Sequence, residues 1–131
     1  MSDTKKIGII GLGYVGSAVR GWFESRGRSH RLFFYDKHKK IGSVQEVNAA
    51  DVIFVAVPTP FQGAGSPSGK RGYDDSAVRE SLAKIKNGKT VVIKSTVLPG
   101  STEKFQKTYP RKIVLFNPEF LRAKTAGEDF L

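Results

Sequence analysis

The 131-residue sequence predicts an α/β fold: a doubly wound parallel sheet of five strands in the order 3-2-1-4-5, with helices on both faces. Three observations predict this fold. Short apolar runs alternate with segments whose apolar residues recur at helical spacing. The run over 52–57 is continuously apolar, as in a parallel strand buried on both faces. A glycine-rich turn joins the first strand to the first helix. We expect residues 1–131 to form a single domain.

The glycine-rich turn reads Gly-Leu-Gly-Tyr-Val-Gly over residues 11–16, which is the G-x-G-x-x-G spacing between a strand and a helix. Gly11 permits a sharp turn, Gly13 leaves room for a pyrophosphate, and Gly16 lets the helix pack on the strand. The N-terminus of the helix presents free N–H groups and the positive end of its dipole to phosphates. This turn predicts a Rossmann-type dinucleotide site.

A carboxylate closes the second strand, over 31–35. Asp36 lies about 20 residues after Gly16, where an acid binds the ribose hydroxyls of NAD. Its charge would repel a 2′-phosphate, which favours NAD over NADP. Lys37, Lys39 and Lys40 favour the opposite choice, but they lie beyond the end of the strand. We therefore expect NAD as the cofactor.

The other elements follow from periodicity, caps and breakers. The first helix is expected over 14–26, with an apolar stripe that includes Val19 and Phe23, and Gly27 is placed to end it. A flexible glycine-rich loop over 61–73 is interpreted either as a lid or as a plain surface loop. A short helix is expected over 44–48, capped by Ser43, and it precedes the strand over 52–57, which stops at Pro58. The next helix begins at Asp75 or Ser76 and buries Val78, Leu82 and Ile85. A strand over 90–93, a helix after Pro99 with Phe105 turned inward, and a strand over 113–116 complete the list.

Composition narrows the classes of function. The chain has no cysteine, which excludes a disulfide framework, a thiolate metal site and a cysteine nucleophile, and we predict no metal site. The absence of cysteine also makes a cytoplasmic location the default expectation. No apolar run reaches the length of a membrane span. The net charge of +10 suits an anionic partner, such as a dinucleotide, a nucleotide sugar or nucleic acid. The basic residues form no dominant block, which disfavours nucleic acid.

Polar or turn residues follow the strands of the predicted sheet. These residues are Gly11, Asp36, Thr59, Ser95 with Thr96, and Asn117 with Glu119. The carboxyl ends of parallel strands share one edge of the sheet, where ligands bind, so we expect these residues to converge. The hydroxyls would then lie near the nicotinamide half of the cofactor.

Four motifs together resemble the N-terminal NAD-binding domain of the UDP-glucose/GDP-mannose dehydrogenase family: Gly11–Gly16, Val57–Pro60, Lys94–Val97 and Asn117–Leu121. That family oxidises the C6 alcohol of a sugar nucleotide to a carboxylate by two hydride transfers to NAD. The resemblance implies that Thr96 helps to hold a catalytic water and that Glu119 is the base that hydrolyses a thioester. The cofactor contacts that it implies are Gly11, Leu12, Gly13, Tyr14, Val15, Gly16, Asp36, Val57, Pro58, Thr59 and Ser95.

The sequence also departs from the family pattern. The family forms its thioester on a cysteine of a later domain, and this chain has none. Ala123 and Lys124 stand where the family has a glutamate and a glycine. We therefore expect the central helix and the sugar-binding domain to be absent, and the chain alone to bind NAD without full turnover.

The partners expected are a nucleotide-sugar substrate with a missing second domain, and either a second copy of the chain or that missing domain packed at the edge strand over 113–116. Apolar residues at the end of the chain support that contact: Phe120, Leu121, Phe130 and Leu131. The alternative function is a stand-alone Rossmann module, binding or regulatory, whose basic surface engages another protein or nucleic acid.

Overall fold

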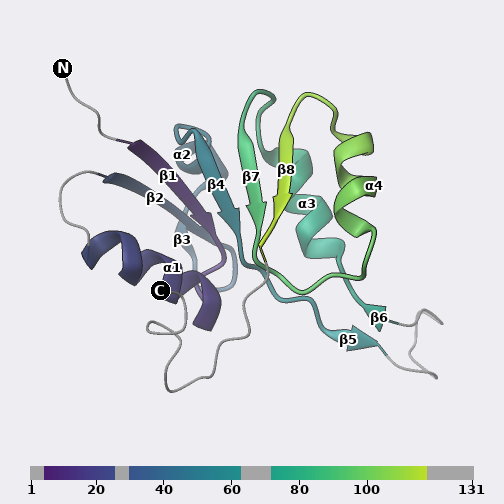
Figure 1. The fold of residues 1–131 in the computed structure, drawn as a ribbon. Coiled ribbons are helices and arrows are strands. Elements are labelled where there is room, and N and C mark those ends of the chain that lie inside the picture. The colour runs from purple at the N-terminus through teal and green to yellow at the C-terminus, as the bar shows by residue number, and fades with distance from the viewer. Residues whose placement is uncertain (1–4, 26–29, 63–71, 118–131) are drawn as a thin grey trace.

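A computed structural model describes residues 5–25, 30–62 and 72–117 (Figure 1). The elements, in chain order, are β1 (Lys5–Ile10), α1 (Tyr14–Ser25), β2 (His30–Asp36), β3 (Ile41–Gly42), α2 (Val44–Val47), β4 (Val52–Val55), β5 (Phe61–Gln62), β6 (Gly72–Tyr73), α3 (Ser76–Lys84), β7 (Thr90–Ile93), α4 (Ser101–Thr108) and β8 (Ile113–Phe116). The expected helices and strands are present, with ends that differ by at most two residues. The Gly27 end of the first helix lies outside the described residues.

The main sheet has six strands in the order β3-β2-β1-β4-β7-β8. All neighbours in it are parallel except β2 and β3, which pair antiparallel. Helices lie on both faces: α1 in front of β1 and β2 in Figure 1, and α2 and α3 behind the sheet. The doubly wound α/β class predicted from the sequence is therefore confirmed.

The predicted strand order 3-2-1-4-5 is wrong. The third parallel strand, β4, pairs with β1 on the side away from β2, so the five parallel strands lie in the order 2-1-3-4-5. A sixth strand, β3, occupies the outer edge of β2, where Tyr35 pairs with Gly42 and Asp36 with Ile41. After β3 the chain continues through α2 to the other side of β1, where β4 pairs. This is the second common doubly wound order, with its ligand crevice where the strand order reverses.

Two apolar clusters hold the layers together. Between α1 and the sheet, Val19 and Phe23 pack with Ile7, Ile9 and Leu12, as the predicted stripe requires. On the other face, α2, α3 and α4 bury one side chain or more each against β4 and β7. That cluster includes Val47, Val78, Leu82, Phe105, Ile53, Val55, Val91 and Ile93. Ser43 caps α2 as expected, since its hydroxyl accepts the N–H of Glu46 at 3.1 Å.

The segment over 61–73 is not a plain loop at its two ends. Phe61 pairs with Tyr73 and Gln62 with Gly72, so β5 and β6 form a two-stranded antiparallel sheet. Residues 63–71 lie outside the described residues. This pairing was not predicted from the sequence, because the glycines between the two strands dominate the local pattern. None of the described helices is long and apolar enough to cross a membrane.

The outer edge of β8 is partly covered by a side chain of α4. Ile113 and Asn117 donate their N–H groups toward β7, so Lys112 and Val114 direct their backbone groups outward. Gln106 meets both of these residues: its Nε2 donates to the Lys112 carbonyl at 2.6 Å, and its Oε1 accepts the Val114 N–H at 2.9 Å. An amide side chain thus occupies part of an edge that would otherwise invite another strand.

We predict that Gln106→Leu lowers the free energy of unfolding by about 1–3 kcal/mol, because it leaves a backbone donor and acceptor of β8 without their partner. Denaturant unfolding would measure this loss. Lys107→Ala, an exposed substitution on the same helix, is the control and should change the free energy by less than about 0.5 kcal/mol. Equal effects of the two substitutions would contradict the assigned role of Gln106.

Candidate functional site

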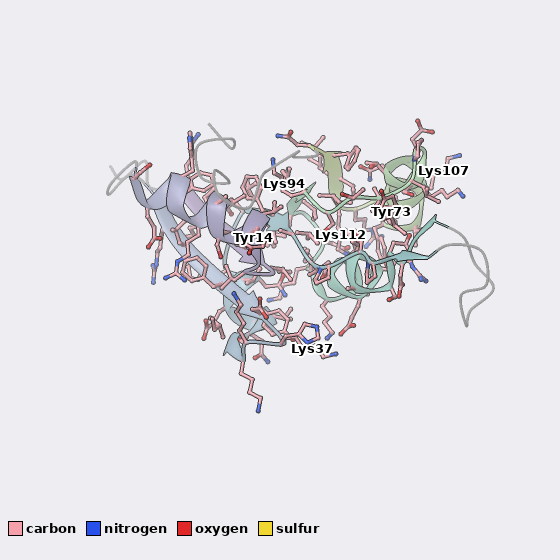
Figure 2. The ribbon with its side chains drawn as sticks, turned by 90° about the horizontal axis from the view of Figure 1, so that it is seen from below. Tyr14, Lys37, Tyr73, Lys94, Lys107 and Lys112 are labelled. Atoms are coloured by element: carbon pink, nitrogen blue, oxygen red, sulfur yellow. The ribbon has the colours of Figure 1, made fainter. Side chains whose placement is uncertain are left out.

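A cavity of about 540 Å³ opens at the carboxyl ends of the parallel strands, the edge that Figure 2 shows from below. Its walls come from the glycine turn after β1, the residues after β2, the ends of β4 and β7, and one side of α3. Its lining contains these residues predicted as site residues: Gly11, Leu12, Gly13, Tyr14, Val15, Asp36, Val57, Pro58, Thr59, Ser95 and Thr96. The fold thus brings together residues that are far apart in the sequence.

The three glycines of the turn have different surroundings. Gly11 has φ +93°, and a Cβ there would lie 2.5 Å from the carbonyl oxygen of Ala56. A Cβ on Gly16 would lie 1.7 Å from the carbonyl oxygen of Gly11, so α1 packs on the turn without a side chain at this position. A Cβ on Gly13 would meet nothing within 4 Å. The middle glycine therefore faces open space, as the pyrophosphate interpretation requires.

Gly16 is the one predicted cofactor contact among the described residues that does not line the cavity. It is buried beneath the turn, where its missing side chain allows the close approach of helix and strand. The structure therefore supports the packing role that the sequence suggested for Gly16, and it places this residue away from the cavity surface.

Asp36 holds the glycine turn in place. Its Oδ2 accepts the backbone N–H of Leu12 at 2.7 Å, and its Oδ1 accepts that of Lys39 at 2.9 Å. The Nζ of Lys39 in turn donates to the carbonyl oxygen of Leu12. Leu12, Asp36 and Lys39 thus form a closed ring of hydrogen bonds, which we call the Leu12–Asp36–Lys39 ring. This ring fixes the position of β2's end relative to the turn after β1.

The carboxylate of Asp36 is ionised at neutral pH. Burial acts to raise its pKa, but backbone N–H groups of Lys39, Leu12 and His38 and the charge of Lys39 outweigh burial, so the pKa lies below its ordinary value. An ionised carboxylate offers about four acceptor positions. The backbone N–H groups of Leu12, His38 and Lys39 do not occupy all of these positions, and Asp36 lines the cavity, so its carboxylate can also accept a ribose hydroxyl.

Charged side chains connect two walls of the cavity. Lys37, which follows β2, lies 3.6 Å from Oε1 of Glu80 on α3. The same oxygen receives Lys84 at 2.8 Å, and these contacts lower the pKa of Glu80, mainly through the hydrogen bond from Lys84. All three side chains are exposed, so each pair adds little to stability. Their significance is positional, because they join the loop after β2 to α3 across the cavity.

The wall at β4 and β7 carries the hydroxyls. The Ser95 hydroxyl donates to the Val57 carbonyl at 2.7 Å and is buried, so it ties the segment after β4 to the end of β7. Thr59 is partly buried and Thr96 is exposed, and both line the cavity. The N–H of Asn117 donates to the Ile93 carbonyl, which brings the end of β8 to the same edge. Glu119, the predicted base, lies outside the described residues.

The lining residues that were not predicted from the sequence include two groups with charged or polar side chains. One is Lys94, which is 2% exposed although it lines the cavity, and which directly precedes the predicted Ser95. A lysine directly after a buried apolar run was the available signal. The other group is the α3 wall, made of Ala77, Glu80, Ser81 and Lys84. Nothing in the sequence marks that wall, because its place beside the cavity depends on the strand order.

The arrangement suits a dinucleotide. The turn leaves open space over Gly13, the first turn of α1 has N–H groups without intrahelical partners, and Asp36 has free acceptor positions. In the described part of the chain, no three His, Asp or Glu side chains gather as a metal would require. The cavity thus offers groups for a diphosphate and a ribose, and any reaction there depends on the reactive group that the cofactor supplies.

We predict that Asp36→Asn destabilises the fold by about 1–2 kcal/mol at neutral pH, because a neutral amide replaces an acceptor of two backbone N–H groups. The folded pKa of Asp36 lies below the unfolded value of about 3.9. Its carboxylate therefore contributes stability above about pH 4, and this contribution is lost as the pH falls through the folded pKa.

Denaturant unfolding of both proteins between about pH 2 and pH 7 would measure this difference. The gap between wild type and Asp36→Asn should narrow in acid. Asp51→Asn, at an exposed position, should change the free energy of unfolding little at pH 7. A gap that stays constant down to pH 2 would show that the ionised carboxylate does not hold the turn.

Several known proteins resemble this chain. It is 40% identical over 90 residues to UDP-glucose 6-dehydrogenase of Rickettsia conorii, which covers 66% of this chain and 20% of that protein. It is 38% identical over 115 residues to UDP-glucose 6-dehydrogenase 5 of Oryza sativa subsp. japonica, covering 81% of this chain and 22% of that protein. The chain therefore spans about a fifth of the length of these curated relatives.

A solved structure shares the fold. The UDP-glucose dehydrogenase of the hyperthermophilic archaeon Pyrobaculum islandicum superposes with a TM-score of 0.76 at 27% identity, over 98% of this chain and 39% of that one. Residues 36–131 match the NAD binding domain of the UDP-glucose/GDP-mannose dehydrogenase family. This chain therefore belongs to the UDP-glucose/GDP-mannose dehydrogenase family as its NAD-binding domain, and its cofactor is NAD.

Proposed function

We propose that this chain is the cofactor-binding part of a nucleotide-sugar dehydrogenase that oxidises the C6 alcohol of a UDP- or GDP-sugar to the acid. The observation that carries the proposal is the single cavity that gathers the glycine turn, Asp36 and the Ser95–Thr96 segment at one edge of the sheet. The named relatives support the substrate class, since they are UDP-glucose 6-dehydrogenases.

The hydrogen bonds of the turn suggest how the chain binds the diphosphate. The N–H of Gly11 donates to the Tyr35 carbonyl, and that of Leu12 donates to Asp36. These two groups are used within the fold, so the donors that we propose for the diphosphate are those of Gly13, Tyr14 and Val15. The first turn of an α-helix leaves such groups without intrahelical partners.

The strand order sets the direction of the cofactor. Asp36, on β2, lies on one side of β1, and the ends of β4 and β7 lie on the other side. We propose that Asp36 binds the adenosine ribose, and that Val57, Pro58, Thr59 and Ser95 contact the nicotinamide half. The α3 wall, which closes the cavity beside the residues after β2, would then contact the adenosine half.

The reaction needs groups that this sequence does not contain. NAD supplies the hydride acceptor when it is bound. Thr96, exposed at the cavity, is proposed to orient a water, and Glu119 is proposed to accept that water's proton in the hydrolysis of a thioester. The thioester requires a thiol, and the sequence has no cysteine. The thiol must therefore come from residues other than these 131, and we propose that the same holds for the sugar-binding surface.

We predict that the pure chain binds NAD and NADH but does not turn over UDP-glucose. Titration calorimetry would measure binding, and absorbance of NADH at saturating NAD and UDP-glucose would measure turnover. The absence of binding heat at millimolar cofactor would refute the first part. Net formation of NADH would refute the second part.

We predict that Gly13→Val abolishes NAD binding and keeps the fold, because the new side chain enters the open space over the turn. Gly21→Val is the matched control: a Cβ at Gly21 also meets nothing within 4 Å, but Gly21 does not line the cavity. Thermal unfolding in the presence and absence of excess NAD would measure both. Stabilisation by NAD that survives in Gly13→Val would contradict the assignment of the turn.

Three expectations from the sequence stay predictions. These are a cytoplasmic location, a homodimer contact at the β8 edge, and the alternative function as a stand-alone module for another protein or nucleic acid. The exposed Ile113, Leu115 and Phe116 of β8 support a contact with a second domain or copy, which light scattering would detect. A gel shift with generic DNA that disappears with added salt would support the alternative.

A further inference from the structure

Among the residues that the structure describes, Lys94 is the largest fully buried side chain. It is 2% exposed, and it lines the cavity at the carboxyl end of β7. Its backbone N–H donates to the Val55 carbonyl at 2.8 Å, so its position is fixed by the pairing of β4 and β7. Lysine is rarely buried to this degree unless its charge interacts with another group, since a charge is costly to remove from water. The proposed binding of NAD gives this residue no role.

The position of Lys94 relative to the two ends of the cavity follows from the sheet. Asp36, proposed to hold the adenosine ribose, lies on β2, and β1 and β4 separate β2 from β7. In Figure 2, which views the carboxyl edge, Tyr14 of the glycine turn lies between Lys94 and Lys37. All three residues line the same cavity. With a diphosphate at the turn, Lys94 belongs to the end of the cavity opposite the adenosine.

We infer that Lys94 sets the balance between oxidised and reduced cofactor by placing a positive charge at the nicotinamide end of the cavity. This inference rests on the proposed function, because it requires the nicotinamide to lie toward β7. The nicotinamide ring is cationic in NAD and neutral in NADH. An ammonium group near the ring repels the oxidised form and leaves the reduced ring unaffected, and the repulsion is strengthened where water is excluded.

The consequence concerns the direction of hydride transfer. A site that binds NADH more tightly than NAD makes the bound oxidised cofactor a better hydride acceptor, by the same factor. The hydride and its two electrons pass from the alcohol carbon to the nicotinamide, and the alcohol proton leaves to a base. Lys94 takes part in none of these transfers. It is a positioning charge that favours oxidation of the sugar alcohol.

The experiment compares the dissociation constants of NAD, NADH and ADP-ribose for wild type, Lys94→Met and Lys84→Met by titration calorimetry. Lys84 is the matched control, because it lines the same cavity from α3 at the adenosine side. ADP-ribose lacks the nicotinamide, so it reports on folding and on the adenosine half of the site. The wild type should bind NADH more tightly than NAD.

In Lys94→Met the preference for NADH should fall by on the order of two- to tenfold. This is the effect expected from removing one positive charge roughly 10 Å from the cationic nicotinamide ring, in surroundings between water and a protein surface in polarity. Binding of ADP-ribose should persist. Lys84→Met should change the affinities for NAD and NADH by the same factor. Lys94→Arg, which keeps the charge, should keep the preference for NADH.

An unchanged preference in Lys94→Met that still binds ADP-ribose would overturn the inference while leaving the proposed function intact. A wild type that binds NAD more tightly than NADH would overturn it as well, even if every Lys94 variant fails to fold. A wild type that binds none of the three compounds would refute the proposed function, and the inference with it.

Discussion

The close approach of three backbone segments at the glycine turn is the constraint on which the rest of the structure depends. The carbonyl oxygen of Gly11 occupies the place of a Cβ on Gly16, and the carbonyl oxygen of Ala56 lies where a Cβ on Gly11 would be. No side chain larger than hydrogen fits at either position. The start of α1, the end of β1 and the end of β4 can therefore meet, and the N-terminus of α1 faces the edge of the sheet.

Hydrogen bonds fix this turn from the side of β2. The Leu12–Asp36–Lys39 ring satisfies both backbone groups of Leu12 and holds an ionised carboxylate at the cavity wall. Asp36 is thus a structural residue before any cofactor arrives. A carboxylate that already has a fixed orientation loses little further freedom when it accepts ribose hydroxyls, which is the advantage of preorganisation in binding.

The distribution of charge follows the same geometry. The chain carries a net charge of +10, and lysines stand at several points of the cavity wall, including Lys37, Lys39, Lys84 and Lys94. The exposed lysines contact Glu80 or the backbone of the turn, whereas Lys94 is buried at the end of β7. A positive field of this kind attracts an anionic dinucleotide, and the carboxylate of Asp36, beside the glycine turn, marks the proposed place of the ribose. The position of each lysine relative to the glycine turn then decides whether its charge acts on the adenosine half or on the nicotinamide half of a bound cofactor.

The sequence by itself determined the fold class, the bounds of the main helices and strands, and the segments at the ends of β1, β2, β4 and β7 that line part of the cavity. Glycine spacing, periodicity and the polar residues after each strand are local signals, and parallel strands bring their carboxyl ends to one edge whatever their order. The position of β4 beside β1 was decided only by the tertiary structure. The outer edge of β2 is instead occupied by β3, a two-residue strand that has no periodicity of its own. The α3 wall and the burial of Lys94 follow from that order, because a residue's exposure depends on which elements pack over it.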